Sequence, residues 1–250
     1  MLGAYFCEVT DMEKLWNDIQ GNLSFVLVCI GIIAALSLLS HLAERYLQAK
    51  RQVSTAKRVS IVGICAAIAA VLHMLDFPLL FLAPEFYKLD FSELPVLICG
   101  FYLGPSAAVA CEGVKILLKL LLKGTSTAFV GDFANFAVGC SFVLPAIILY
   151  HLNKTRKGAV VGLTVGTVIL SIFGSAFNAI YLLPKFAQLY GMPLDTIIAM
   201  GSKVNAGVTD VATFVILCVA PLNIVKGVSV SALTLLLYKK GERVIFHRTK

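Results

Sequence analysis

Asn223 and Lys226 lie three residues apart within residues 206–238, an apolar run long enough to cross a bilayer. Residues at this spacing share one face of a helix, so the amide and the ammonium must point in the same direction. A charged side chain inside a membrane is costly unless it faces a polar cavity or a partner. The pair therefore indicates one wall of a small-molecule site rather than an inert membrane span.

A third polar side chain, Asn178, lies deep in the apolar segment 158–183. An amide in such a segment must find a hydrogen-bond partner, and it offers a donor and an acceptor together. With Asn223 and Lys226 it places polar groups on two consecutive helices. Such a set suits a flat heterocycle that carries alternating carbonyl and N–H groups on one edge. Hydrogen bonding between the helices themselves is the alternative interpretation.

Another polar series recurs at steps of three and four residues, which places it on one helix face: Glu112, Lys115, Lys119 and Lys123. Glu112 and Lys115 are one turn apart and are expected to pair, either to hold the bundle together or to line a ligand path. Lys119 and Lys123 can extend to the outer interface. Asp132 is expected to cap the following helix at its N-terminus, and the role of Asn135 stays open.

The composition places this chain in the membrane. Of its 250 residues, 59% are hydrophobic and 14% are charged, whereas soluble domains average about 45–50% and about 25%. The net charge of +7 is explained by basic loops, so it does not indicate nucleic-acid binding. The seven cysteines show no CxxC or other metal-ligand spacing and are expected to be buried apolar side chains, with no metal site. The sequence contains no GxxxxGK[ST] motif, so we expect no ATP hydrolysis by that chemistry.

Charge patterning predicts the topology. The basic residues gather in three clusters, at 45–58, 152–157 and 239–250, all cytoplasmic by the positive-inside rule. An even number of crossings must separate the first two clusters, so the short segment 91–103, which contains Pro95, must count as one. The predicted crossings are therefore 23–42, 59–75, 91–103, 105–122, 132–151, 158–183 and 206–238.

The predicted architecture is an all-α integral membrane protein, with a six-helix core preceded by one extra transmembrane helix. We expect three parts: residues 1–57 with an acidic extracellular N-terminus, the extra helix and a basic linker; the core at 58–240; and a cytoplasmic tail at 241–250. Residues 103–106 are expected to form a tight turn. The segments 76–90, 123–131 and 184–205 would face outward.

Residues 76–90 contain two prolines and much aromatic and aliphatic surface. A loop this apolar is unusual in contact with water. The segment is therefore expected to be a lid over a site that opens outward, or a partly embedded cover.

Several ordered segments carry a resemblance to a known family: LDFSELP at 89–95, GFYLGP at 100–105, GDFANF at 131–136, NAIYLLP at 178–184 and PLNIVKG at 221–227. From about Arg58 to Lys240 the chain resembles the substrate-binding S component of energy-coupling-factor (ECF) vitamin transporters, specifically the riboflavin-binding member. The motifs are collinear over nearly three quarters of the chain, which is far more specific than any one alone.

The resemblance implies six helices around an outward-opening pocket that is closed by residues 76–90. It also implies that the matching residues Asn178, Asn223 and Lys226 contact riboflavin, which is a transported ligand and not a cofactor. Leu89 and Asp90, at the end of the lid loop, match further binding positions. The resemblance also implies that a transmembrane coupling subunit contacts the chain at Ala66 and Ala70. Two ATPase subunits would drive uptake across the cell membrane, and nothing in the resemblance explains the extra helix.

Three alternatives stay open from the sequence. The first is an S component for another vitamin, such as thiamine. The second is an intramembrane enzyme using Glu112, Lys115 or Asp210, although no recognisable pair of nucleophile and base supports it. The third is a structural membrane scaffold, which would leave Lys226 buried without a purpose.

Overall fold

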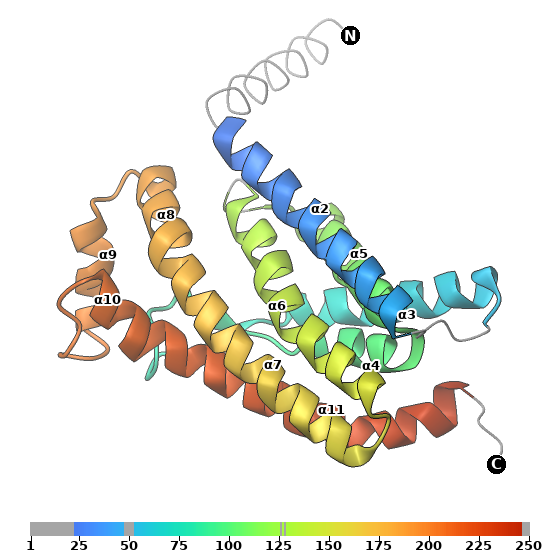
Figure 1. The fold of residues 1–250 in the computed structure, drawn as a ribbon. Coiled ribbons are helices and arrows are strands. Elements are labelled where there is room, and N and C mark those ends of the chain that lie inside the picture. Colours follow the sequence, from blue (N-terminus) through green and yellow to red (C-terminus); the bar gives the residue numbers. More distant parts are fainter. Residues whose placement is uncertain (1–22, 48–52, 126, 128, 247–250) are drawn as a thin grey trace, which may run out of the picture.

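The computed structural model describes residues 23–47, 53–125, 127 and 129–246, and within these ranges the chain is almost entirely helical (Figure 1). The helices are α2 (Leu23–Tyr46), α3 (Thr55–Met74), α4 (Glu93–Leu103), α5 (Pro105–Lys123), α6 (Val130–Leu152), α7 (Arg156–Phe177), α8 (Leu183–Tyr190), α9 (Leu194–Ser202), α10 (Val211–Phe214) and α11 (Ala220–Phe246). Two π-helical turns, η1 (Asn178–Leu182) and η2 (Val215–Val219), interrupt the longer rods. Two short strands, β1 (Phe77–Pro78) and β2 (Lys88–Leu89), pair antiparallel.

Five helices in the described part of the chain are long and apolar enough to cross a membrane: 27–46, 55–74, 130–152, 156–190 and 211–237. Helix α4 is apolar but has only 11 residues, about 17 Å at the α-helical rise. Helix α5 has 19 residues but carries Glu112 and three lysines. The predicted all-α membrane class is confirmed, whereas the count of seven crossings stays a prediction.

Helix boundaries follow from local capping. The Ser54 hydroxyl accepts a hydrogen bond from the N–H of Lys57 at the start of α3, and the Thr155 hydroxyl accepts one from the N–H of Gly158 at the start of α7. Between α4 and α5, Gly104 has a φ of 105°, a conformation that favours glycine. The following Pro105 is the first residue of α5, where its missing N–H costs nothing. The predicted tight turn at 103–106 is confirmed.

The fifth predicted core span ends later than its sequence pattern indicated. Residues 184–190 were expected to leave the membrane as part of an outward loop, but α7, η1 and α8 form one continuous rod to Tyr190 (Figure 1). The helix continues because Pro184 lies at the first turn of α8, directly after the π-helical turn η1. Pro221 likewise lies in the first turn of α11, directly after the second π-helical turn, η2. π-helical turns of this kind often occur at functional sites.

One end of the bundle is closed by close contact between helix backbones. At Gly162 an added Cβ would lie 2.5 Å from the carbonyl oxygen of Ala146, and at Gly166 it would lie 2.6 Å from that of Phe142. Helices α6 and α7 therefore touch along their backbones, as small residues permit in membranes. We call this region, with the neighbouring Gly100 that packs against Ile147, the closed end.

The extra helix α2 lies against α5 and α6 and is fixed by a polar contact (Figure 1). Glu44, only 5% exposed, pairs with Arg58 of α3 at 3.0 Å. Arg58 also donates to the hydroxyl of Ser106 in α5 at 2.7 Å, and that hydroxyl bonds to Glu44. Three helices are thereby joined at the closed end. The predicted acidic N-terminus (1–22), the linker residues 48–52 and the tail residues 247–250 lie outside the described residues.

Candidate ligand-binding site

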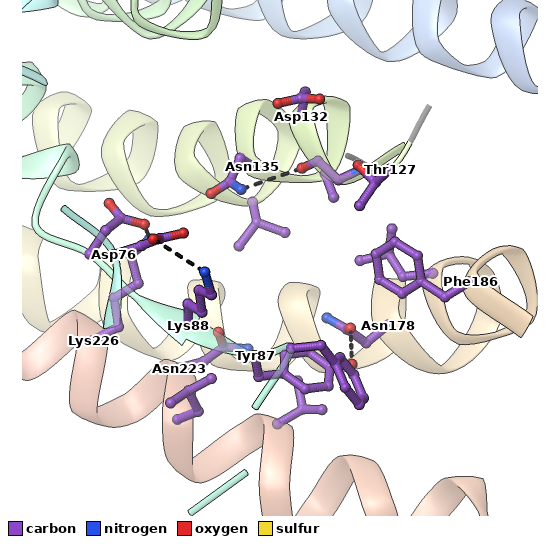
Figure 2. A pocket seen from close by; sticks show the side chains of 18 of the residues that line it. Asp76, Tyr87, Lys88, Thr127, Asp132, Asn135, Asn178, Phe186, Asn223 and Lys226 are labelled. Atoms are coloured by element: carbon purple, nitrogen blue, oxygen red, sulfur yellow. Dashed lines mark hydrogen bonds and ion pairs between the residues drawn. The ribbon is translucent and has the colours of Figure 1, made fainter. Parts of the chain in front are cut away.

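A cavity of about 390 Å³ opens at the other end of the bundle, between the β1–β2 segment, α6, η1 and α11 (Figure 2). Its volume lies within the range of small-molecule sites, roughly 300–1,000 Å³. Asn178, Asn223 and Lys226 all line it, as does Asp90. The structure thus brings together the three side chains from which the sequence predicted a site. We call this region the cavity end.

Asn178 is 6% exposed, and both ends of its amide are engaged. Its Nδ2 donates to the carbonyl oxygen of Gly174 at 2.7 Å, and its Oδ1 accepts from the Tyr87 hydroxyl at 2.6 Å. Tyr87 belongs to the segment predicted to cover the site, so one hydrogen bond ties that segment to η1 (Figure 2). Sequence reasoning did not single out Tyr87, because nothing local distinguishes it from the other aromatic residues of the segment.

Asn223 has a buried donor with no partner. Its Nδ2 is enclosed and makes no hydrogen bond within the described part of the chain. Gly174 leaves room for it, since a Cβ there would lie 2.7 Å from that nitrogen. An unsatisfied buried donor costs about 1–3 kcal/mol, and this one lies in the cavity wall. Asn223 is therefore a residue of the cavity wall whose buried donor is left unpaired by the described part of the chain.

Lys226 is compensated by carboxylates. Its Nζ, on a side chain that is 12% exposed, lies 3.1 Å from Asp90 Oδ2 and 3.0 Å from Glu93 Oε1. The sequence indicated that this charge needs a polar cavity or a partner, and the two carboxylates are partners that the sequence did not identify. Two of the three N–H donors of the ammonium are used, which leaves one for the cavity. Glu93 was missed because its partner is far away in the sequence.

The two positions expected at the end of the covering segment differ. Asp90 lines the cavity and accepts from the backbone N–H of Ser92 at 2.8 Å, and His73 Nδ1 lies 3.4 Å from its carboxylate. Leu89 is buried but lies in strand β2 opposite Phe77 and is not part of the cavity lining. Of this pair, only Asp90 is therefore placed for direct contact with a ligand.

The wall opposite Asn178 and Asn223 is formed by α6 and the turn before it. Asn135 lies there with its Nδ2 donating to the carbonyl of Gly131 at 3.3 Å (Figure 2). The expected helix cap at Asp132 is wrong. Phe129 stands at the cap position, and the Asp132 carboxylate instead accepts from Lys119 at 2.5 Å and from Thr125 at 2.7 Å.

The segment 76–90 covers part of the cavity. Phe86, Tyr87 and Lys88 line it, and the Tyr87 ring packs against Phe214 with centroids 6.0 Å apart. At the rim, Asp76 lies 3.4 Å from the ammonium of Lys88 and 3.7 Å from that of Lys123. Leu79 and Ala83 also pack into the core, whereas Leu80 and Phe81 are exposed, so only part of this apolar segment is packed as a cover.

Two further expectations concern residues away from the cavity. Glu112 and Lys115 do pair, and both are fully buried within the bundle rather than lining the cavity.

Ala66 and Ala70 are 0% and 1% exposed, so they pack against this chain's own helices and do not present a docking surface. The small residues of α3 that do face outward are Gly63 and Ala67. The burial of Ala66 and Ala70 therefore does not support the coupling-subunit contact that the resemblance implied for them.

Residues 57–238 match the family model of the ECF transporter, substrate-specific component. The chain belongs to this family. It is 31% identical to a riboflavin transporter, FmnP, of Bacillus subtilis (strain 168) over 185 residues, which cover 74% of this chain and 91% of that protein. It is 34% identical to a riboflavin transporter, RibU, of Staphylococcus aureus (strain TCH60) over 184 residues, 74% of this chain and 89% of the relative.

A solved structure agrees with the family assignment. The structure described as that of the S component of a bacterial ECF transporter aligns with a TM-score of 0.60 and 33% identity, covering 77% of this chain and 99% of the other. This S component is thus a multi-pass membrane protein of a transporter and not an enzyme, which removes the intramembrane-enzyme alternative. Helix α2 precedes the residues that match the family model.

Proposed function

We propose that this S component binds riboflavin in the cavity and supplies it to an ECF transporter for uptake. The observation that carries the proposal is the buried, unpaired Nδ2 of Asn223, placed in one cavity with Asn178 and Lys226. The riboflavin transporters among its relatives support the same ligand.

The polar edge of the isoalloxazine ring presents one N–H between two carbonyl groups. Asn223 Nδ2 would donate to one carbonyl, and the third N–H of Lys226 would donate to a carbonyl or ring nitrogen. The ring N–H would donate to Asn178 Oδ1. This oxygen has two lone pairs, and the Tyr87 hydroxyl uses only one of them. Each partner is then satisfied without moving the carboxylates that hold Lys226.

The remaining lining is suited to the apolar part of the ring. Phe86, Leu182 and Phe186 face the cavity and would cover the ring and exclude water. A thiamine-binding S component is the nearest rival. The riboflavin transporters among the relatives of this chain favour riboflavin over thiamine.

Uptake would use a separate energy-coupling module, with a transmembrane coupling subunit and two ATPase subunits. In the proposed orientation the cavity faces outward, the C-terminus is cytoplasmic and the N-terminus is extracellular, as the basic clusters indicate. The coupling subunit would meet α3 on the face that carries Gly63 and Ala67, since Ala66 and Ala70 are enclosed.

The direct test is titration of the purified protein with riboflavin while flavin fluorescence is recorded, with thiamine as the competing ligand. Saturable quenching that thiamine does not reverse is expected. No saturable quenching at micromolar riboflavin would reject the proposal.

The Lys226→Ala variant is expected to bind riboflavin more weakly by about 1–3 kcal/mol, because it loses a charged hydrogen bond to the ring. The same fluorescence titration measures the change, with Lys203→Ala, at an exposed turn, as the control. Unchanged affinity in a folded Lys226→Ala variant would assign Lys226 a purely structural role.

A further inference from the structure

Ionisable side chains from four helices and the segment before α4 form one connected group that extends from the cavity wall into the bundle. We call it the charge network, and its members are His73, Asp90, Glu93, Glu112, Lys115 and Lys226. Lys115 pairs with Glu112, lies 3.6 Å from Glu93 and donates to the hydroxyl of Ser92 at 3.0 Å. His73, Asp90 and Lys226 line the cavity, whereas Glu93, Glu112 and Lys115 are at most 1% exposed. The network thus connects the cavity to the interior of the bundle.

The formal charges in this network do not balance. It contains three carboxylates (Asp90, Glu93 and Glu112) and two ammonium groups (Lys115 and Lys226), a net charge of −1 when His73 is neutral. Helix α6 borders the network at Gly139 and at the Cys140 thiol, and neither residue adds a carboxylate or an ammonium group to it. An uncompensated charge in the interior of a membrane protein is strongly unfavourable. One added proton would make the network neutral.

The hydrogen bonds indicate where that proton resides. Asp90 is the best-satisfied carboxylate, because it accepts from the Ser92 N–H and from Lys226 and lies beside His73. In contrast, Glu93 Oε2 and Glu112 Oε2 are buried without a partner among the described residues. Two carboxylates that share a buried site hold a proton far more readily than either would alone.

Gly139 allows these two carboxylates to converge. A Cβ at that position would collide with Glu112 Oε1 and lie 3.5 Å from Glu93 Oε1, so both side chains border the same point. The absence of a side chain at residue 139 leaves room for the pair.

We propose that the charge network holds one exchangeable proton on Glu112, which unlike Glu93 pairs with only one of the two ammonium groups, and that riboflavin binding is linked to this proton. This inference rests on the proposed function, because the link runs through Lys226. Lys115 pairs with Glu112 and lies 3.6 Å from Glu93, and Glu93 in turn accepts from the Lys226 ammonium. Protonation of Glu112 leaves Lys115 to pair with Glu93, which weakens the hold of Glu93 on the Lys226 ammonium and leaves its N–H groups freer to donate to the ring. The proton is taken up from water that reaches the network by way of the cavity-lining His73 and Asp90.

The sign of the linkage follows. The protonated form binds riboflavin more tightly, so affinity falls as the pH rises and the proton is lost. One proton limits the slope to about tenfold in affinity per pH unit. Riboflavin binding also draws a fraction of a proton from the buffer wherever the free protein is incompletely protonated, by reciprocity of the same linkage.

The test is calorimetric titration of the detergent-solubilised full chain with riboflavin, from pH 6 to pH 9, in two buffers of different ionisation enthalpy. The wild-type protein is expected to take up protons on binding and to lose affinity with increasing pH. Glu112→Gln makes the network neutral without a proton, so it is expected to bind riboflavin with little pH dependence and no proton uptake. Glu93→Gln provides a second variant with the same expected loss of linkage, and Asp210→Asn, at an exposed helix cap, is the control that retains it.

The outcomes separate the two proposals. No riboflavin binding at any pH rejects the proposed function. Riboflavin binding without proton uptake and without pH dependence in the wild-type protein overturns the proton-linkage inference alone. Linkage that persists in Glu112→Gln overturns the assignment of the proton to that carboxylate.

Discussion

At the closed end the backbones of α6 and α7 touch through Gly162 and Gly166, whereas at the cavity end the enclosed amide nitrogen of Asn223 has no partner in the described part of the chain. The first region is held by van der Waals contact between backbones, which is the main source of helix association in membranes. The second is held by hydrogen bonds and ion pairs, but some of its buried polar atoms, such as Asn223 Nδ2, have no partner among the described residues. The contrast separates the residues that stabilise the bundle from those held ready for a ligand.

The cavity end also departs from regular helical geometry. Both π-helical turns contribute to the cavity lining, through Asn178 and Leu182 of η1 and Val219 of η2. A π-helical turn shifts the side chains that follow it relative to a regular α-helix, and it leaves some backbone groups less well paired. The closed end contains no π-helical turn within the described residues. Substitutions there should therefore affect folding and not ligand recognition.

The largest effect is expected from Gly166→Leu. Its side chain would overlap the carbonyl oxygen of Phe142 and the Cβ of Ala146, and overpacking of this kind costs about 1–3 kcal/mol or more. A strongly lowered midpoint of thermal unfolding in detergent is expected. Gly63→Leu is the matched control, because a Cβ there has no neighbour within 4 Å. Equal midpoints for the two variants would contradict the close contact of α6 and α7.

A smaller but more specific effect is expected from Asn223→Ala. Because the Asn223 Nδ2 has no hydrogen-bond partner among the described residues, its removal should leave the thermal midpoint unchanged or raised. Riboflavin affinity should fall by about 1–3 kcal/mol, the value of a buried polar contact. Fluorescence titration measures the affinity, with Asn205→Ala, in an exposed turn, as the control. A variant that is destabilised yet binds normally would reverse the interpretation.

Tyr87→Phe tests the attachment of the covering segment. It removes the hydroxyl that donates to Asn178 Oδ1 at 2.6 Å and keeps the ring packed against Phe214. A net hydrogen bond contributes about 0.5–1.5 kcal/mol, so a loss of riboflavin affinity of this size is expected. Tyr46→Phe, at a residue that is 84% exposed, should have no effect. If Tyr87→Phe binds as tightly as the wild type, the hydrogen bond does not order the binding site.

The smallest effect on binding is expected from Glu44→Gln. The substitution weakens the polar contact between α2, α3 and α5, and charged hydrogen bonds of this partly exposed kind contribute about 1 kcal/mol or less. A slightly lower thermal midpoint with riboflavin affinity within about twofold of wild type is expected. Glu85→Gln, a residue of the covering segment outside the charge network, is the control. A large loss of affinity would connect α2 to the binding site.

The sequence determined the membrane class, the order of the helices, the tight turn at Gly104 and the set formed by Asn178, Asn223 and Lys226. These features depend on local composition and helical spacing, which are readable without knowledge of long-range contacts. The faces that helices bury and the residues at which they end were harder to predict from the sequence. Ala66 and Ala70, which the resemblance placed at the surface that meets the coupling subunit, are buried, because a motif does not show which face of a helix its neighbours cover. Residues 184–190 were assigned to a loop, because a proline at the first turn of a helix looks the same in sequence as one that ends it.

The partners of the polar residues could be decided only by the tertiary structure. Lys226 contacts Asp90 and Glu93 across 136 and 133 residues of chain, and Tyr87 reaches Asn178 across 91. The sequence shows that a buried charge needs compensation, because the cost of burial is a property of the residue and its apolar surroundings. Which group compensates it depends on how the helices pack, and that arrangement arises only when the whole bundle has formed.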